Sequence, residues 1–144
     1  MQIKDLKLRE AKPSDHPHLL LWDGPKDLEL QQLAYRENAD RISYRTHLLS
    51  RIAPQSRFLA LHHQLERELD AIKAICATTP KPVVLLTDLD CLITYLHVQP
   101  ESPITLFWQN LWNTRHLERI LWIVLPSKLA PPNWDDSRCL KFKM

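Results

Sequence analysis

Glycine is almost absent from this sequence. Its 144 residues include a single glycine, Gly24, beside eleven prolines. Loops that wrap a phosphate need several positions without a Cβ, because the backbone must turn sharply and approach the ligand closely. Glycine-rich phosphate loops of every standard type are therefore excluded.

Cysteine, excess charge of one sign and long apolar runs are also scarce. Cys76, Cys91 and Cys139 lie far apart and form no C-x-x-C pair, which predicts reduced thiols and no metal site. Nineteen basic against 17 acidic residues leave a net charge of +2, too small for a general field that attracts phosphates. No apolar run approaches the ~20 residues that span a bilayer, and the charged start lacks the apolar core of a signal peptide. We expect a cytoplasmic protein without membrane contact.

What the sequence does contain is a series of short aliphatic runs. The clearest occupies residues 83–87, where VVLLT follows two prolines and gives way to Asp88 and Asp90. A run without alternation is typical of a strand buried on both faces. Similar runs predict strands at 18–22 and 120–125. Shorter, mixed segments predict a second strand at 40–44 and a last edge strand at 139–142. Helical spacing predicts helices from about Pro25 to Asn38, from Thr46 to Ile52, and at 56–77, 91–96 and 103–114.

Alternation of these strands and helices predicts an α/β fold. The expected architecture is a three-layer sandwich with a mostly parallel, five-stranded sheet. The length suits one domain. We expect an N-terminal arm at 1–17, followed by the α/β domain at 18–144.

The first strand, its turn and the following helix have the layout of a P-loop NTPase. Reading the motif G-x-x-x-x-G-K-[ST] from Gly24 places Glu29 at the second glycine, Leu30 at the lysine and Gln31 at the hydroxyl. Glu29 brings negative charge towards a polyphosphate, and Leu30 removes the cation that would offset its charge. Lys26 approaches a phosphate only if the turn is shortened. The chain is thus P-loop-like with a degenerate Walker A motif.

Loss of the phosphate loop predicts a protein that is not an enzyme. We expect no catalytic residue, no metal site and no cofactor, with ATP and magnesium disfavoured. The vestigial cofactor-binding positions are Gly24, Lys26, Asp88 and Asp90. A subunit that binds nucleotide weakly through these positions is an alternative.

Four segments, at 19–25, 41–72, 83–92 and 102–127, resemble in order the small P-loop proteins of BREX phage-defence systems, the BrxF family. The family carries a full phosphate loop, and here Thr87 stands where an ungapped match expects the magnesium-linked aspartate. The resemblance implies additional-strand NTPase topology, with strand 83–87 beside the first strand. It also implies a cytoplasmic accessory subunit of an antiviral complex, with partners that include a large ATPase and a DNA-processing protein, and assembly into rings or filaments.

Helix 103–114 carries a heavy aromatic stripe that includes Trp108 and Trp112. Such a stripe is more often core or interface than a platform for stacking bases. This helix and the proline-rich loop 126–134 are the predicted protein contact surfaces. Arg115 could face a neighbouring subunit's site as an arginine finger does.

Two other functions remain open. Asp88 and Asp90 also resemble the D-x-D-G-T-L motif of haloacid-dehalogenase phosphatases, in which the first aspartate attacks phosphorus. However, Cys91 and Leu92 replace the glycine and threonine. DNA binding is the other candidate, through a basic edge with acidic residues interleaved; its arginines are Arg36, Arg41, Arg45, Arg51 and Arg57.

Overall fold

The computed structural model describes residues 8, 17–51, 65–99, 103–114, 117–131, 134 and 138–142. Its elements, in chain order, are β1 (His18–Trp22), α1 (Asp27–Arg36), β2 (Ala39–Ser43), α2 (Tyr44–Arg51), α3 (Leu65–Thr78), β3 (Val83–Thr87), α4 (Asp90–His97), α5 (Pro103–Trp112), β4 (Ile120–Leu125), the 3-10 turn η4 (Ser127–Leu129) and β5 (Cys139–Phe142).

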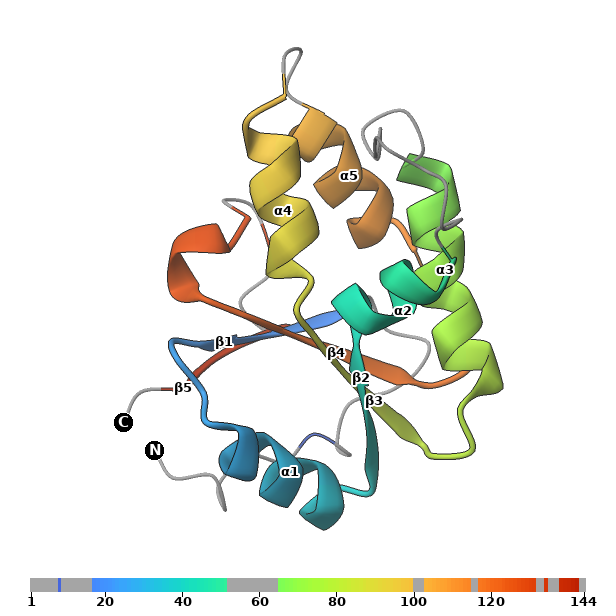
Figure 1. Cartoon of the computed structure of the whole chain (residues 1–144), viewed down its shortest axis with the longest axis vertical. Helices are drawn as coiled ribbons and strands as arrows, with labels where there is room; N and C mark the ends of the chain where they lie inside the picture. Colours follow the sequence, from blue (N-terminus) through green and yellow to red (C-terminus); the bar gives the residue numbers. More distant parts are fainter. Residues whose placement is uncertain are drawn as a thin grey trace.

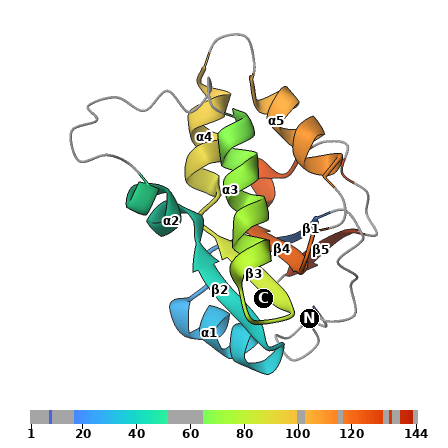
Figure 2. The ribbon, with the colours of Figure 1, turned by 90° about the vertical axis from the view of Figure 1, so that its right-hand side faces the viewer.

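The five strands form one sheet in the order β2-β3-β4-β1-β5, and every neighbouring pair is parallel. Helix α1 lies on one face, whereas α2, α3, α4 and α5 lie on the other (Figures 1 and 2). This is the predicted α/β sandwich. The prediction that strand 83–87 lies beside the first strand is wrong, because β4 separates β3 from β1.

The core divides into two clusters because successive strand residues point to opposite faces. In β1, Leu19 and Leu21 pack towards α2–α5, whereas Leu20 and Trp22 pack towards α1. Leu8 is fully buried in the α1 cluster. Its N–H donates to Glu37 Oε1 at 2.5 Å, and its carbonyl accepts from the indole of Trp122 at 3.1 Å. Part of the segment predicted as an arm therefore contributes to the core.

The boundary between the second strand and the next helix needs correction. Helix α2 begins at Tyr44, which is fully buried, so Tyr44 does not end β2 and the helix does not begin at Thr46. In α3 the charged residue Glu68 has no solvent exposure. The remainder of the long helix predicted at 56–77, residues 56–64, lies outside the described residues. None of the helices among the described residues is both long and apolar enough to cross a bilayer.

Candidate functional site

A pocket of about 430 Å³ lies at the carboxyl ends of β1, β3 and β4. The connection from β1 to β2 runs through α1 on one face of the sheet (Figure 1). The connection from β4 begins with η4 on the other face and leads to β5, on the far side of β1. The connections of two neighbouring strands thus leave in opposite directions. Open α/β sheets bind ligands at such a topological switch point. We call this cavity the switch-point pocket; its polar lining comes from Asp27, Arg41, Thr87, Asp88 and Asp90.

The turn between β1 and α1 is short and is tied to the end of β4. Only residues 23–26 separate the two elements. Gly24 has a φ of 62°, in the left-handed region that favours glycine. Asp23 Oδ1 accepts a hydrogen bond from the Ser127 N–H at 2.8 Å, and its Oδ2 accepts from the Ser127 hydroxyl at 3.2 Å. The turn is therefore held by side chains rather than shaped around a phosphate.

The amino-terminal turn of α1, where a P-loop protein would hold phosphate, carries its own carboxylates. The Lys26 N–H donates to Glu29 Oε1 at 3.1 Å. Asp27 forms an ion pair with Arg41 at 2.6 Å, and its carbonyl accepts from the same guanidinium at 3.2 Å. Leu30, at the position of the phosphate-binding lysine, is 6% exposed and belongs to the core. The first turn of α1 therefore carries two carboxylates, whose negative charge would oppose a phosphate at this helix end.

Asp88 lies just beyond β3 in a conformation that few residues adopt. Its φ is 65°, a left-handed backbone that aspartate tolerates better than most side chains do. Its Oδ2 accepts a hydrogen bond from the Ser43 hydroxyl at 2.5 Å, and Ser43 Oγ accepts from the Thr46 N–H at 3.2 Å. Asp88 is exposed, and Asp90 is half-buried at the start of α4. The side chain of Asp88 is thus fixed by α2 and β2.

The structure brings three of the four vestigial positions together. Gly24, Asp88 and Asp90 line the switch-point pocket, but Lys26 is exposed and does not line it. Within the described ranges, no group of three or more His, Cys, Asp or Glu side chains is placed to hold a metal ion. The pocket therefore gathers carboxylates without the lysine that a nucleotide triphosphate would require.

The arginines predicted to contact DNA are largely engaged. Arg36 Nε lies 3.7 Å from Glu37 Oε2, Arg41 pairs with Asp27, and Arg51 pairs with Glu68; Arg45 is exposed. Arg57 lies outside the described residues. A carboxylate beside each of three arginines weakens the field that would attract a phosphate backbone.

A buried ionic cluster joins α2 to α3. Arg51 Nη2 and Nη1 donate to the two oxygens of Glu68 at 2.7 and 3.1 Å, and the Tyr44 hydroxyl donates to Glu68 Oε1 at 2.5 Å. Burial opposes ionisation of Glu68, but these hydrogen bonds outweigh it and lower the pKa of that carboxyl. Burial, reinforced by the Glu68 charge, raises the pKa of Tyr44 well above its usual value. Glu68 could have been suspected because it falls on the apolar stripe of α3, three residues after Leu65.

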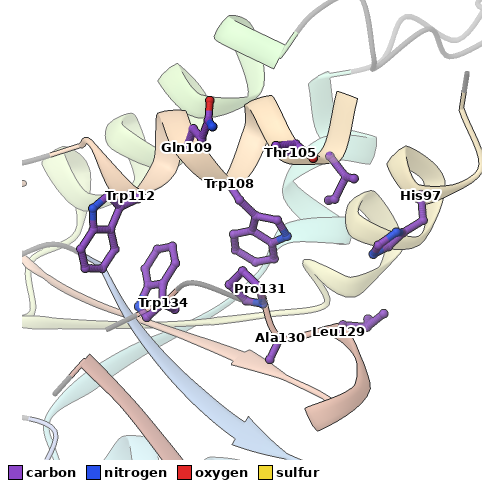
Figure 3. A pocket seen from close by; sticks show the side chains of 10 residues that line it. His97, Thr105, Trp108, Gln109, Trp112, Leu129, Ala130, Pro131 and Trp134 are labelled. Atoms are coloured by element: carbon purple, nitrogen blue, oxygen red, sulfur yellow. The ribbon is translucent and has the colours of Figure 1, made fainter. Parts of the chain in front are cut away.

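A second cavity, of about 520 Å³, lies between α5 and a wall that includes Leu129, Ala130, Pro131 and Trp134. We call it the indole groove because Trp108, Trp112 and Trp134 line it (Figure 3). Trp108 is 8% exposed and Trp112 is half-buried, so one face of the predicted aromatic stripe remains accessible. Arg115 lies outside the described residues. Sequence reasoning selected the helix and the loop separately but missed that they face each other across one cavity.

No protein-family model matches the sequence, and none of the curated proteins is recognisably similar to it.

Proposed function

We propose that this chain is a non-hydrolysing, P-loop-like assembly subunit, a cytoplasmic accessory component of an anti-phage defence complex. The observation that carries this proposal is that carboxylates of the chain occupy the amino-terminal turn of α1 at the switch-point pocket. The resemblance to the BREX proteins supplies the setting, and the all-parallel sheet with helices on both faces agrees with it. The partners are other proteins of the complex, including a large ATPase.

Electrostatics disfavours a nucleotide at this position. A triphosphate would approach Asp27 and Asp88, both of which line the pocket. Among the described lining residues the one cation is Arg41, and it already pairs with Asp27. P-loop proteins instead place free backbone N–H groups and a lysine around the phosphates. Here the Lys26 N–H is taken by Glu29, and Leu30 is buried in the core. The pocket has therefore kept the place of a ligand site but not its chemistry.

A weak nucleotide site is the second candidate, because Asp88 and Asp90 both line the pocket and Ser43 fixes the Asp88 carboxylate. Such a site would hold magnesium between the carboxylates and the phosphates. The same pair could serve as nucleophile and acid of a haloacid-dehalogenase-like phosphatase.

Calorimetric titration with ATP and magnesium separates these functions. For an assembly subunit we expect no heat of binding in the native chain, in Asp88→Asn or in Asp90→Asn. Binding heat that disappears in either variant would establish a metal–nucleotide site and overturn the proposal. In parallel, hydrolysis of p-nitrophenyl phosphate that is lost in Asp88→Asn would establish the phosphatase.

Assembly itself is measured by light scattering and sedimentation of the purified chain. A P-loop-like subunit that forms rings or filaments should show concentration-dependent mass growth without ATP. A chain that remains monomeric at all concentrations would leave partner proteins as its only means of assembly.

A further inference from the structure

The side chain and the backbone of Leu8 are held by residues far along the chain. The side chain has no solvent exposure and lies in the α1 cluster. The backbone N–H donates to Glu37 Oε1 at 2.5 Å, and the carbonyl accepts from Trp122 Nε1 at 3.1 Å. We call these two side chains and the apolar cluster around Leu8 the Leu8 socket. It recognises one residue at three points, through an apolar side chain, an amide donor and a carbonyl acceptor.

The socket is positioned by contacts that do not involve Leu8. Glu37 is the C-cap of α1, where its N–H donates to the Leu33 carbonyl at 3.0 Å, and its carboxylate lies 3.7 Å from Arg36 Nε. Trp122 lies in β4, inside the sheet, and its ring stacks on that of His18 at a centroid distance of 4.7 Å. The recognising groups are therefore fixed by the domain itself, which reduces the entropy lost when a segment docks.

The way in which Leu8 is held is typical of a docked peptide. Buried backbone groups of a domain pair mostly with the backbone of a neighbouring strand or helical turn. The two backbone groups of Leu8 instead pair with side chains that lie 29 and 114 residues away in the sequence. These contacts would be the same whichever copy supplied Leu8, since residues 9–16, which connect it to Pro17, take no part in them. Identical contacts in both arrangements are the condition for exchange of an element between copies.

We propose that the Leu8 socket is a peptide-docking site whose occupant in the assembled protein is the N-terminal arm of a second copy. Each copy donates its own arm and accepts that of another, so that copies join head to tail and close into a ring or continue as a filament. The inference rests on the proposed function, for which it supplies the contact between subunits.

Charge and reach favour the arm as the occupant. Residues 1–12 carry opposite net charge to residues 26–40, which include α1 and Glu37. The first segment has Lys4, Lys7, Arg9 and Lys12 against Asp5 and Glu10, and the second has Asp27, Glu29, Glu37 and Asp40 against Lys26 and Arg36. A fully extended chain from Leu8 to Pro17 spans about 30 Å, the diameter of a small domain. An arm can thus reach the socket of a copy that lies in contact with its own.

The arm of each copy competes for its own socket. Because the contacts are identical, the balance depends on the protein concentration relative to the effective concentration of the tethered arm, which is on the order of millimolar for a short linker. Exchange should therefore rise as the protein concentration approaches that range.

The first test adds a synthetic peptide of residues 1–12 to the intact chain carrying Leu8→Asp. An aspartate cannot enter the apolar cluster without losing its hydration, so the tethered arm leaves the socket empty. We expect saturable calorimetric binding of the native-sequence peptide, and binding about 30-fold weaker or less for a control peptide that carries Leu8→Ala. The native chain should bind the peptide more weakly than the variant does, because its own arm competes. Equal binding of the two peptides, or no binding to the variant when circular dichroism shows it folded, would overturn the proposal.

A second measurement needs no destabilising substitution. Leu8 is replaced by photoleucine, which on illumination cross-links to the groups that its side chain contacts, and the chain is mixed with isotope-labelled native chain at up to about 1 mM. We expect cross-links from position 8 to the α1 cluster of the labelled chain, in a fraction that rises with concentration. Photoleucine at position 28, where Leu28 is 63% exposed, is the control and should give none to that cluster. Cross-links confined to one molecule at every concentration would contradict exchange.

The two proposals can fail separately. If the native chain assembles and Leu8→Asp assembles equally well, arm exchange is wrong and the assembly function stands. Binding heat with ATP that disappears in Asp88→Asn would overturn the proposed function, whereas the peptide and cross-linking results do not depend on it.

Discussion

The switch-point pocket and the indole groove differ in how their polar groups are satisfied. Around the switch-point pocket the polar groups bind one another: Asp27 pairs with Arg41, Ser43 binds Asp88, and the Lys26 N–H binds Glu29. The wall of the indole groove contains a buried donor, Trp134 Nε1, with no partner among the described residues. The switch-point pocket has the position in the fold that is typical of a ligand site. The indole groove has instead the buried donor without a partner among the described residues.

This contrast teaches that a ligand site can lose its chemistry while its place in the fold persists. The sheet end remains hollow because the connections of β1 and β4 diverge there, whatever side chains they carry. Binding requires in addition that groups remain free to pair with a ligand. Where polar groups at a cavity already pair with one another, they contribute less free energy to binding a ligand.

The largest effect is expected from a substitution at Leu30, a buried residue that lines the switch-point pocket. Leu30→Lys installs the lysine of a phosphate loop at a residue that is 6% exposed and packed in the α1 cluster. Losing the apolar contacts and burying an ammonium group should lower the free energy of unfolding by about 3–5 kcal/mol, measured by urea denaturation. The control is Leu28→Lys on the same helix, where Leu28 is 63% exposed and the change should stay within about 0.5 kcal/mol. If both substitutions lowered the free energy of unfolding by the same small amount, position 30 would accommodate a lysine without loss of packing.

The next effect tests whether the ion pair between α2 and α3 stabilises the fold. Glu68→Gln removes the charge that holds Arg51, and should cost about 2–3 kcal/mol at pH 7, because Glu68 has no solvent exposure although the Arg51 side chain is 21% exposed. The exposed Glu66 supplies the control, with Glu66→Gln expected to be near neutral.

The same variant has a defined pH dependence. Since the pKa of Glu68 is lower in the folded chain than its usual 4.5, ionised Glu68 stabilises the fold fully above about pH 4.5. This contribution is lost as the pH falls through the folded pKa. Urea denaturation from pH 7 to pH 3 should therefore show a smaller acid loss in Glu68→Gln than in the native chain. Parallel curves for the two proteins would contradict the lowered pKa.

A smaller effect compares a satisfied indole with an unsatisfied one. Trp122→Phe removes a donor whose acceptor, the buried Leu8 carbonyl, is then left unpaired. The free energy of unfolding should therefore fall by about 2 kcal/mol. Trp134→Phe removes a donor that has no partner among the described residues, and should lower the free energy of unfolding by less than about 1 kcal/mol. Thermal and urea unfolding of both variants measures the difference. A larger loss at Trp134 would mean that its N–H is paired in the free protein.

The sequence alone predicted the positions of most strands and which residues would gather at the switch-point pocket. The aliphatic runs of β1, β3 and β4 determine their bounds because a strand buried on both faces admits little else. That Gly24 and Asp88 would meet follows from parallel strands ending at the same sheet edge. The order of strands did not follow, because whether β3 or β4 lies beside β1 depends on packing between elements far apart in the chain.

The features that sequence reasoning missed are long-range pairings. The pairing of Glu68 could not be predicted from its own helix, because its partner Arg51 lies in another helix, 17 residues away. Trp134 gave no periodic signal because it lies in a loop, and its contacts with Trp108 and Trp112 become visible only when that loop faces α5. Tyr44 favours strands by propensity, but it is the first residue of α2, and its buried hydroxyl binds Glu68 of α3.

The smallest expected effect concerns the ion pair at the mouth of the switch-point pocket. The side chain of Asp27 is 73% exposed and that of Arg41 is 27% exposed, so solvent screens their attraction despite the 2.6 Å contact. Asp27→Asn should lower the free energy of unfolding by less than about 1 kcal/mol at low salt, and the loss should vanish in 1 M NaCl. The matched control is Asp70→Asn, at an exposed carboxylate of α3. A loss that persists at high salt would show that Asp27 seals the turn of α1 more firmly than a surface ion pair can, which would deepen the contrast with the open indole groove.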